Sequence, residues 1–170
     1  MLFRSRDPAG VTLVAVTKTV SPRVAGLIAE LGVLDLGENR PQELWRKAEA
    51  LKHLPIRWHL IGHVQRNKIE RTLPLVHMIH SVDSLRLWSA IQLEAQRTGK
   101  HPQLLLQMNA SGEEQKQGFD YDELLVMPEP EECGTIMVGL MGMAAYSDDR
   151  EKARPAFAAL RQFQIGRAHV

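Results

Sequence analysis

The amino-acid sequence predicts an α/β fold in which repeated strand and helix units surround a parallel sheet. Short runs of β-branched and other apolar residues alternate along the chain with amphipathic segments, which is the pattern of repeated βα units. The chain has 170 residues, of which 44% are hydrophobic and 24% charged, so it is long enough to bury one sizeable core. No low-complexity linker interrupts it, and a single domain is therefore expected.

Six strands are expected where apolar and β-branched residues run together. They are predicted near residues 11–17, 33–37, 57–61, 76–80, 103–108 and 135–141. Six helices are expected between and after them, at residues 21–31, 40–52, 66–73, 83–98, 120–126 and 149–163. Several helices begin at residues that favour helix N-termini, namely Ser21 followed by Pro22, Asp83 and Asp148. The Pro-Glu-Pro-Glu-Glu run at 128–132 is typical of a loop.

The composition narrows the possible functions. Twenty-one Lys and Arg against 20 Asp and Glu give a formal net charge of +1, so no strong basic field points to nucleic acid or to an anionic membrane. This charge balance does not exclude the binding of a small anionic ligand. The single cysteine, Cys133, has no partner for an internal disulfide, and neither a secretory leader nor an apolar run of about 18 residues is present. Together these features favour a cytoplasmic protein.

Polar or small residues follow nearly every predicted strand. In chain order they are Lys18; Gly37, Glu38 and Asn39; His59, Gly62 and His63; His80 and Ser81; Asn109; and Met141, Gly142 and Met143. In open α/β sheets and in (β/α) barrels this edge is the ligand edge, because the βα loops and the helix N-termini converge there. We therefore expect a binding site at the carboxyl ends of the strands.

Lys18 stands out because it ends the apolar run of the first strand. An amine partly desolvated by the strand beneath it would have its charged form disfavoured, and would become a better nucleophile toward carbonyl groups. That is the requirement for a Schiff base. The alternative is that Lys18 only extends its charged end into solvent.

Five segments of the chain resemble, in order and spacing, the signature blocks of the pyridoxal phosphate homeostasis protein family, also called YggS-like or proline synthetase co-transcribed homologue. They are AVTKT (15–19), LGENRPQE (36–43), WHLIGHVQRNK (58–68), HSVDSLRL (80–87) and QMNASGEEQKQGF (107–119). The resemblance covers residues 7 to 143. It implies a TIM-type (β/α) barrel similar to the N-terminal domain of alanine racemase, with pyridoxal 5′-phosphate (PLP) held as a Schiff base on the lysine that Lys18 matches.

Five further residues are candidates for contact with the cofactor. Asn39 matches the family asparagine that lies near the cofactor, although capping of the next helix explains it equally well. His59 lies in the third strand and either touches the cofactor or is a hydrogen-bonded core residue. Ser81 and Asn109 end the fourth and fifth strands, where a ligand contact and a turn or cap are both open. Met141 covers one face of the cofactor ring in this interpretation, or simply packs in the barrel.

No metal site is expected. His59 and His63 are four residues apart, but Gly62 breaks the strand between them and no carboxylate or cysteine ligand accompanies them. We also assign no catalytic residue from the sequence.

Two expected parts of a complete barrel are missing from the sequence. The family's phosphate-binding segments, S–x-GMS–x-D and R–x-G, do not occur, and six units account for residues 1–163, whereas a full barrel has eight units and about 250 residues. Residues 164–170, ending IGRAHV, resemble the translation of a sequencing adapter and not the family, so Arg167 is not assigned to the phosphate. We expect an incomplete barrel of about six units, poorly stable alone; a natural six-unit protein is the alternative.

Three functions follow as expectations. The resemblance implies a PLP-binding protein of cofactor homeostasis, monomeric when complete, with PLP-dependent apoenzymes as an open class of partner. The alternative is a PLP-dependent enzyme on amino acids, such as a racemase with Lys18 as one base. Racemases of the related fold need a second acid–base group, commonly a tyrosine, and the only tyrosines are Tyr121 and Tyr146. A scaffold for protein interaction is the third possibility.

Overall fold

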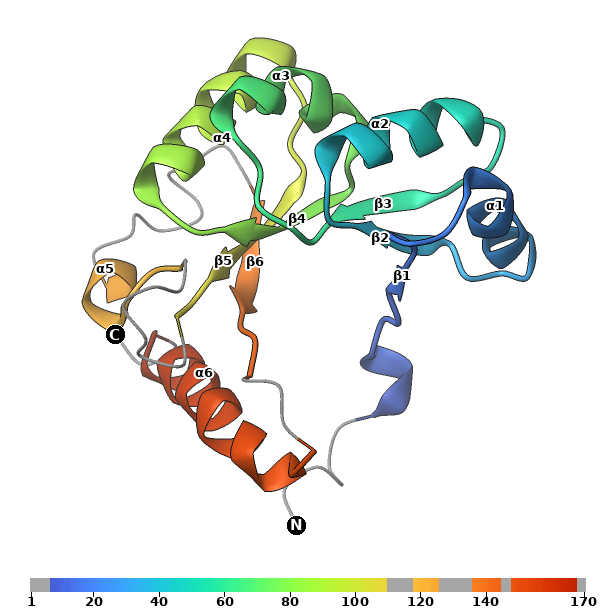
Figure 1. Ribbon diagram of the computed structural model, residues 1–170. Coiled ribbons are helices and arrows are strands. Elements are labelled where there is room, and N and C mark those ends of the chain that lie inside the picture. Colours follow the sequence, from blue (N-terminus) through green and yellow to red (C-terminus); the bar gives the residue numbers. More distant parts are fainter. Residues whose placement is uncertain (1–6, 110–117, 126–135, 145–147, 168–170) are drawn as a thin grey trace.

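A computed structural model describes residues 7–109, 118–125, 136–144 and 148–167 (Figure 1). The predicted loop at 128–132, Cys133 and Tyr146 lie outside the described residues. The last helix ends at Arg167 and therefore includes residues 164–167. These four residues belong to the segment that we expect from the sequence to be a non-native tail.

The sheet contains six parallel strands in the order of the sequence, β1-β2-β3-β4-β5-β6. The strands are β1 (Ala15–Val16), β2 (Asp35–Glu38), β3 (Arg57–Leu60), β4 (Met78–Val82), β5 (Gln103–Gln107) and β6 (Ile136–Met141). A doubly wound open sheet would reverse its strand order, whereas a (β/α) barrel does not. The predicted barrel type is therefore confirmed. Within the described residues β1 and β6 are not paired, so the barrel is not closed.

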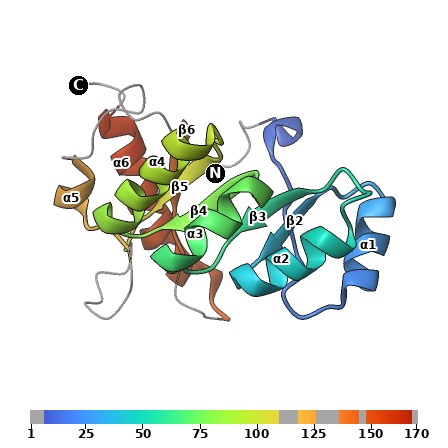
Figure 2. The same ribbon diagram turned by 90° about the horizontal axis from the view of Figure 1, so that it is seen from above.

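Helices connect the strands. They are α1 (Pro22–Glu30), α2 (Pro41–Ala50), α3 (Ile69–Thr72), α4 (Leu85–Thr98), α5 (Tyr121–Leu125) and α6 (Arg154–Arg167). Short 3₁₀ turns occur at η1 (Pro8–Gly10), η2 (Arg66–Lys68), η3 (Leu73–Leu75) and η5 (Arg150–Ala153). Helices α1 to α4 cover one face of the sheet, as the view from above also shows (Figures 1 and 2). Among the helices that the structure describes, none combines the length and the apolar character that crossing a bilayer requires.

Several boundaries differ from the sequence prediction. The first strand is only two residues long because it pairs with β2 alone, and Val11 and Leu13 before it are exposed. The cap of α4 is Ser84, whose hydroxyl accepts a hydrogen bond from Leu87 N, and not Asp83. The cap of η5 is likewise Asp149 and not Asp148. Ser21 caps α1 as predicted.

The third predicted helix, 66–73, is not continuous. The structure divides this stretch into η2, a single turn of α-helix in α3, and η3, which contains Pro74. Proline has no backbone N–H and clashes with the preceding turn, so a regular helix does not continue through it.

The core lies between the sheet and the helices. Alternate strand residues point to this side and are almost completely buried: Leu36, Trp58, Leu60, Ile79, Leu104 and Leu106. They pack with helix residues such as Leu44, Leu87 and Ile91. The residues between them, including Asp35, Arg57 and His59, lie on the opposite face of the sheet, which is polar near β2 and β3. Apolar side chains of the two edge strands, Val16, Ile136 and Val138, are exposed, as expected where a barrel is not closed.

Candidate functional site

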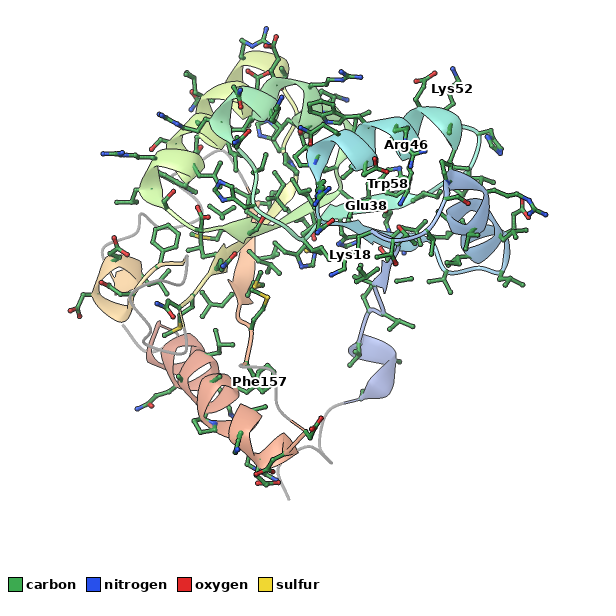
Figure 3. The ribbon with its side chains drawn as sticks, in the orientation of Figure 1. Lys18, Glu38, Arg46, Lys52, Trp58 and Phe157 are labelled. Atoms are coloured by element: carbon green, nitrogen blue, oxygen red, sulfur yellow. The ribbon has the colours of Figure 1, made fainter. Side chains whose placement is uncertain are left out.

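Lys18 lies in the turn that follows β1, at the carboxyl edge of the sheet (Figure 3). Its side chain is exposed and makes no hydrogen bond or ion pair with the described residues. The partial desolvation expected from the sequence is therefore not present, because β1 is a short edge strand with one neighbour and covers little of the side chain. The structure places a freely accessible primary amine at this position.

Directly before Lys18, three buried side chains form a cluster that we call the buried charge cluster: Thr17, Glu38 and Lys47. Lys47 Nζ donates hydrogen bonds to Glu38 Oε1 and to the backbone oxygen of Thr17, both at 2.6 Å. The Thr17 hydroxyl donates to Glu38 Oε1, also at 2.6 Å. The side chains of Glu38 and Lys47 are 0% exposed. Lys47 was not expected from the sequence to belong to a site, and Glu38 was expected only as one of the polar residues at the end of the second strand.

Asn39 follows β2, and its backbone is in very close contact with Gly62 in the loop after β3. A Cβ atom on Gly62 would lie 2.2 Å from the Asn39 carbonyl oxygen, so only glycine fits there. Ser81, near the end of β4, donates a hydrogen bond from its hydroxyl to the Gly62 carbonyl oxygen at 2.7 Å. The ends of β2, β3 and β4 are thus held together. Ser81 is buried and contacts a loop, rather than presenting its hydroxyl at the edge.

Asn39 does not cap the following helix. The cap position of α2 is Arg40, and no side chain provides a cap hydrogen bond there. The half-buried Asn39 side chain therefore lies at the carboxyl edge without the structural role that the sequence left open as an alternative.

His59 belongs to a chain of polar groups on the face of the sheet opposite the helices. Arg57 binds the carboxylate of Asp35 through two nitrogens, with Nε 2.7 Å from Oδ1, and this bond is the main reason that the pKa of Asp35 is lowered to about 2. His59 Nε2 lies 3.0 Å from the same Oδ1, and His59 Nδ1 lies 2.9 Å from His80 Nε2. Because the ionised carboxylate only accepts, His59 carries its proton on Nε2 and accepts from His80. His59 is a satisfied interior residue.

The structure predicts acid sensitivity from this chain. Burial, followed by the charge of His59, lowers the pKa of His80 from 6.5 to about 4, and burial also lowers the pKa of His59. The unfolded chain binds protons on these rings at higher pH than the folded chain, so stability is present above pH 6.5 and is lost as the pH falls toward 4. We expect the free energy of unfolding, measured by urea titration, to decrease over this window. The decrease should be smaller in His80→Gln and unchanged in His101→Gln, an exposed histidine; an equal decrease in His80→Gln would contradict the assignment.

Asn109 and Met141 lie at the carboxyl ends of β5 and β6. The backbone N–H of Met108 donates to the Met141 oxygen at 2.8 Å, and that of Asn109 to the Phe119 oxygen at 3.0 Å. Both side chains are half-buried. Lys18 and Asn39 follow adjacent strands, whereas Asn109 and Met141 lie at the other end of the sheet, with β3 and β4 between the two pairs.

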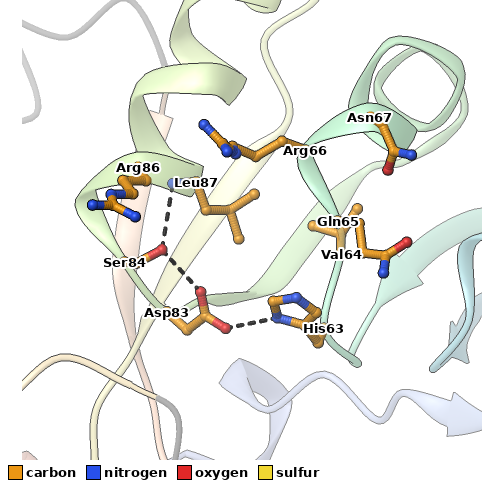
Figure 4. A pocket seen from close by; sticks show the side chains of 9 residues that line it. All are labelled: His63, Val64, Gln65, Arg66, Asn67, Asp83, Ser84, Arg86 and Leu87. Atoms are coloured by element: carbon orange, nitrogen blue, oxygen red, sulfur yellow. Dashed lines mark hydrogen bonds and ion pairs between the residues drawn. The ribbon is translucent and has the colours of Figure 1, made fainter.

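A pocket of about 580 Å³ opens between the loops that follow β3 and β4 (Figure 4). Its lining includes Gln65, Arg66 and Arg86, but none of the six residues predicted to bind the cofactor. His63 and Asp83 also line it, with His63 Nδ1 2.8 Å from Asp83 Oδ2. His59 and His63 therefore have different partners, and the described residues contain no group of three that could hold a metal ion.

Parallel strands in sequence order, with helices covering one face of the sheet, are typical of a (β/α) barrel. A family model described as alanine racemase, N-terminal domain, matches residues 3–170. An alanine racemase of Clostridium difficile shares the fold with a TM-score of 0.72 at 14% identity, over 94% of this chain and 43% of the racemase.

More similar proteins narrow the assignment. A pyridoxal phosphate homeostasis protein of Aquifex aeolicus is 36% identical over 154 residues, which are 89% of this chain and 68% of that protein. The structures of PipY from Synechococcus elongatus, without and with PLP bound, match with TM-scores of 0.85 and 0.84 at 32% and 31% identity, over 94% of this chain and 76% of PipY. The chain belongs to the pyridoxal phosphate homeostasis protein family, as the sequence blocks predict.

Proposed function

We propose that this protein binds PLP for intracellular homeostasis of the cofactor and holds it as a Schiff base on Lys18. The observation that carries the proposal is the position of Lys18: an exposed amine, without a partner among the described residues, in the turn after β1 of this fold. A PLP-bound structure exists for the similar protein PipY.

The proposed chemistry requires an unprotonated amine that can approach the PLP aldehyde in a suitable geometry. With PLP bound, the uncharged Nζ of Lys18 would supply the amine for a C=N bond to the aldehyde carbon, and the aldehyde oxygen would leave as water. In this proposal Asn39 offers its amide to the cofactor, and Asn109 and Met141 contact the cofactor from the carboxyl ends of β5 and β6. Ser81 and His59 act indirectly, because their polar atoms already bind Gly62, Asp35 and His80.

Other features belong to this proposal as expectations. The protein is expected to be a cytoplasmic monomer, with PLP-dependent apoenzymes as its class of protein partner. The racemase alternative is not proposed, since the side chains of Tyr121 and Tyr146 lie outside the described part of the structure.

The test is a comparison of the protein with Lys18→Ala and with Lys100→Ala, which removes an exposed lysine before β5, at the opposite edge of the sheet. Each protein is incubated with PLP, freed of excess, examined for a near-visible absorbance band, reduced with borohydride and mapped by mass spectrometry. We expect the band and an adduct on Lys18 in the unmodified protein and in Lys100→Ala, and neither in Lys18→Ala. An adduct spread evenly over the exposed lysines would refute the proposal. Racemisation of alanine, lost in Lys18→Ala, would restore the enzyme alternative.

A further inference from the structure

Thr17, the residue immediately before Lys18, has all of its polar groups bound. Its N–H donates to the Gly37 oxygen at 2.9 Å, its hydroxyl donates to Glu38, and its carbonyl oxygen accepts from Lys47. The same carbonyl oxygen accepts from Val20 N at 3.1 Å, which closes the turn that contains Lys18. The buried charge cluster therefore fixes the backbone at the point where this turn begins.

Little else holds this turn in place. Strand β1 has two residues and, among the strands that the structure describes, pairs only with β2. The residues on both sides of Thr17, Val16 and Lys18, are exposed. Glu38 comes from β2 and Lys47 from α2, so the cluster ties the end of the edge strand to two elements of the core. Lys18 lies near Glu38 beneath α2, whereas Lys52 lies away from it, past the other end of the helix (Figure 3).

Stability alone does not account for a charged pair at this place. Removing two ions from water costs several kcal/mol for each, and apolar residues of similar volume often give equal or greater stability. The pair instead fixes Thr17 by two hydrogen bonds: Glu38 accepts from its side-chain hydroxyl, and Lys47 donates to its backbone carbonyl oxygen. It also compensates its own charge, so it adds no net charge beside the Lys18 amine.

We propose that Glu38 and Lys47 are positioning residues: through Thr17 they hold the turn so that the Lys18 amine is presented for Schiff-base formation. This inference rests on the proposed function of Lys18. Neither residue touches the reacting atoms, and both act on the geometry from which the amine extends.

The test uses a double variant, Glu38→Leu with Lys47→Met, which removes both charges at similar side-chain volume. The matched control is Glu49→Leu with Lys52→Met, because Lys52 Nζ and Glu49 Oε1 form the same type of ion pair at 2.9 Å on the exposed side of the same segment. Thr17→Val is a second variant, which keeps the carbonyl oxygen and loses only the hydroxyl. The rate of the near-visible band, the share of borohydride-trapped adduct on Lys18, and hydrogen exchange of residues 15–20 are measured for each.

We expect the double variant to form the Lys18 adduct about tenfold more slowly, since small misplacement of a reacting group has effects of this order or larger. Exchange at residues 15–20 should be faster in the double variant, Thr17→Val should be intermediate, and the control should match the unmodified protein. Far-ultraviolet circular dichroism checks that each variant is folded. If the double variant does not fold, the positioning role is decided by Thr17→Val alone.

Two negative results have different meanings. If the unmodified protein forms no selective adduct on Lys18, the proposed function fails and this inference fails with it. If the unmodified protein forms the adduct and the folded double variant, or Thr17→Val in its place, forms it at the same rate and with the same selectivity, only the positioning role is overturned.

Discussion

Replacing Lys47 alone by alanine is expected to lower the free energy of unfolding by about 3–5 kcal/mol, the cost of leaving one member of a buried ion pair without its partner. Glu38 would keep only the Thr17 hydroxyl as a donor, and its Oε2 already has no hydrogen-bond partner among the described residues. The loss of the long Lys47 side chain also leaves unfilled volume next to Leu44 and Ala48, which share its buried helix face.

Urea unfolding of three variants checks this prediction. Lys52→Ala, which breaks the exposed ion pair, should cost about 0–1 kcal/mol. The apolar double variant Glu38→Leu with Lys47→Met should be far less destabilised than Lys47→Ala, because no charge is left buried. If Lys47→Ala and Lys52→Ala have equal effects, Lys47 is not buried as the structure places it.

Replacing Gly62 by alanine is expected to destabilise the protein by about 2–3 kcal/mol, at the upper end of the usual cost of overpacking. The new Cβ would lie 2.2 Å from the Asn39 oxygen and 2.9 Å from the Asn39 carbonyl carbon, and these are backbone atoms that cannot rotate away. The loop after β3 must then move, which weakens the hydrogen bonds from Ser81 to Gly62 and from Ile61 N to the Glu38 oxygen at 2.9 Å.

The control for Gly62→Ala is Gly10→Ala, since a Cβ on Gly10 meets nothing within 4 Å. Its effect on the free energy of unfolding should stay within about 0.5 kcal/mol. Thermal unfolding followed by circular dichroism compares the two. Equal midpoints for Gly62→Ala and the unmodified protein would show that the loops after β2 and β3 are further apart than described.

The architecture could be predicted from the sequence because each strand is a short apolar run and an amphipathic segment lies between successive strands. All six strands overlap their predicted ranges, although β2 and β4 extend one and two residues beyond them, and the barrel type followed from the sequence blocks. The length of the first strand could not be predicted from the sequence. The apolar run from Val11 to Thr17 is long enough for a full strand, but the number of its residues that pair depends on where β2 begins.

The buried charge cluster could not be predicted from the pattern of charged residues along the chain. Lys47 stands among Glu43, Arg46 and Glu49, a run typical of a solvated helix face. Its spacing nevertheless contains a signal: Leu44, Lys47, Ala48 and Leu51 follow the i, i+3, i+4, i+7 pattern of the buried face. Lys47 occupies a core position of α2, nine residues after Glu38, which occupies a core position at the end of β2. Neither element identifies the pair by itself.

The contacts that fix Thr17 also determine when the turn that contains Lys18 can form. Lys18 belongs to the first βα unit, whereas Glu38 and Lys47 belong to the second, so the first unit alone lacks the hydrogen bonds that these two side chains supply. Among the described residues, the hydrogen-bond partners of Thr17 all lie between residues 20 and 47. During synthesis from the N-terminus, the geometry around Lys18 can therefore be established once α2 has packed on β2, well before the later strands of the sheet have emerged.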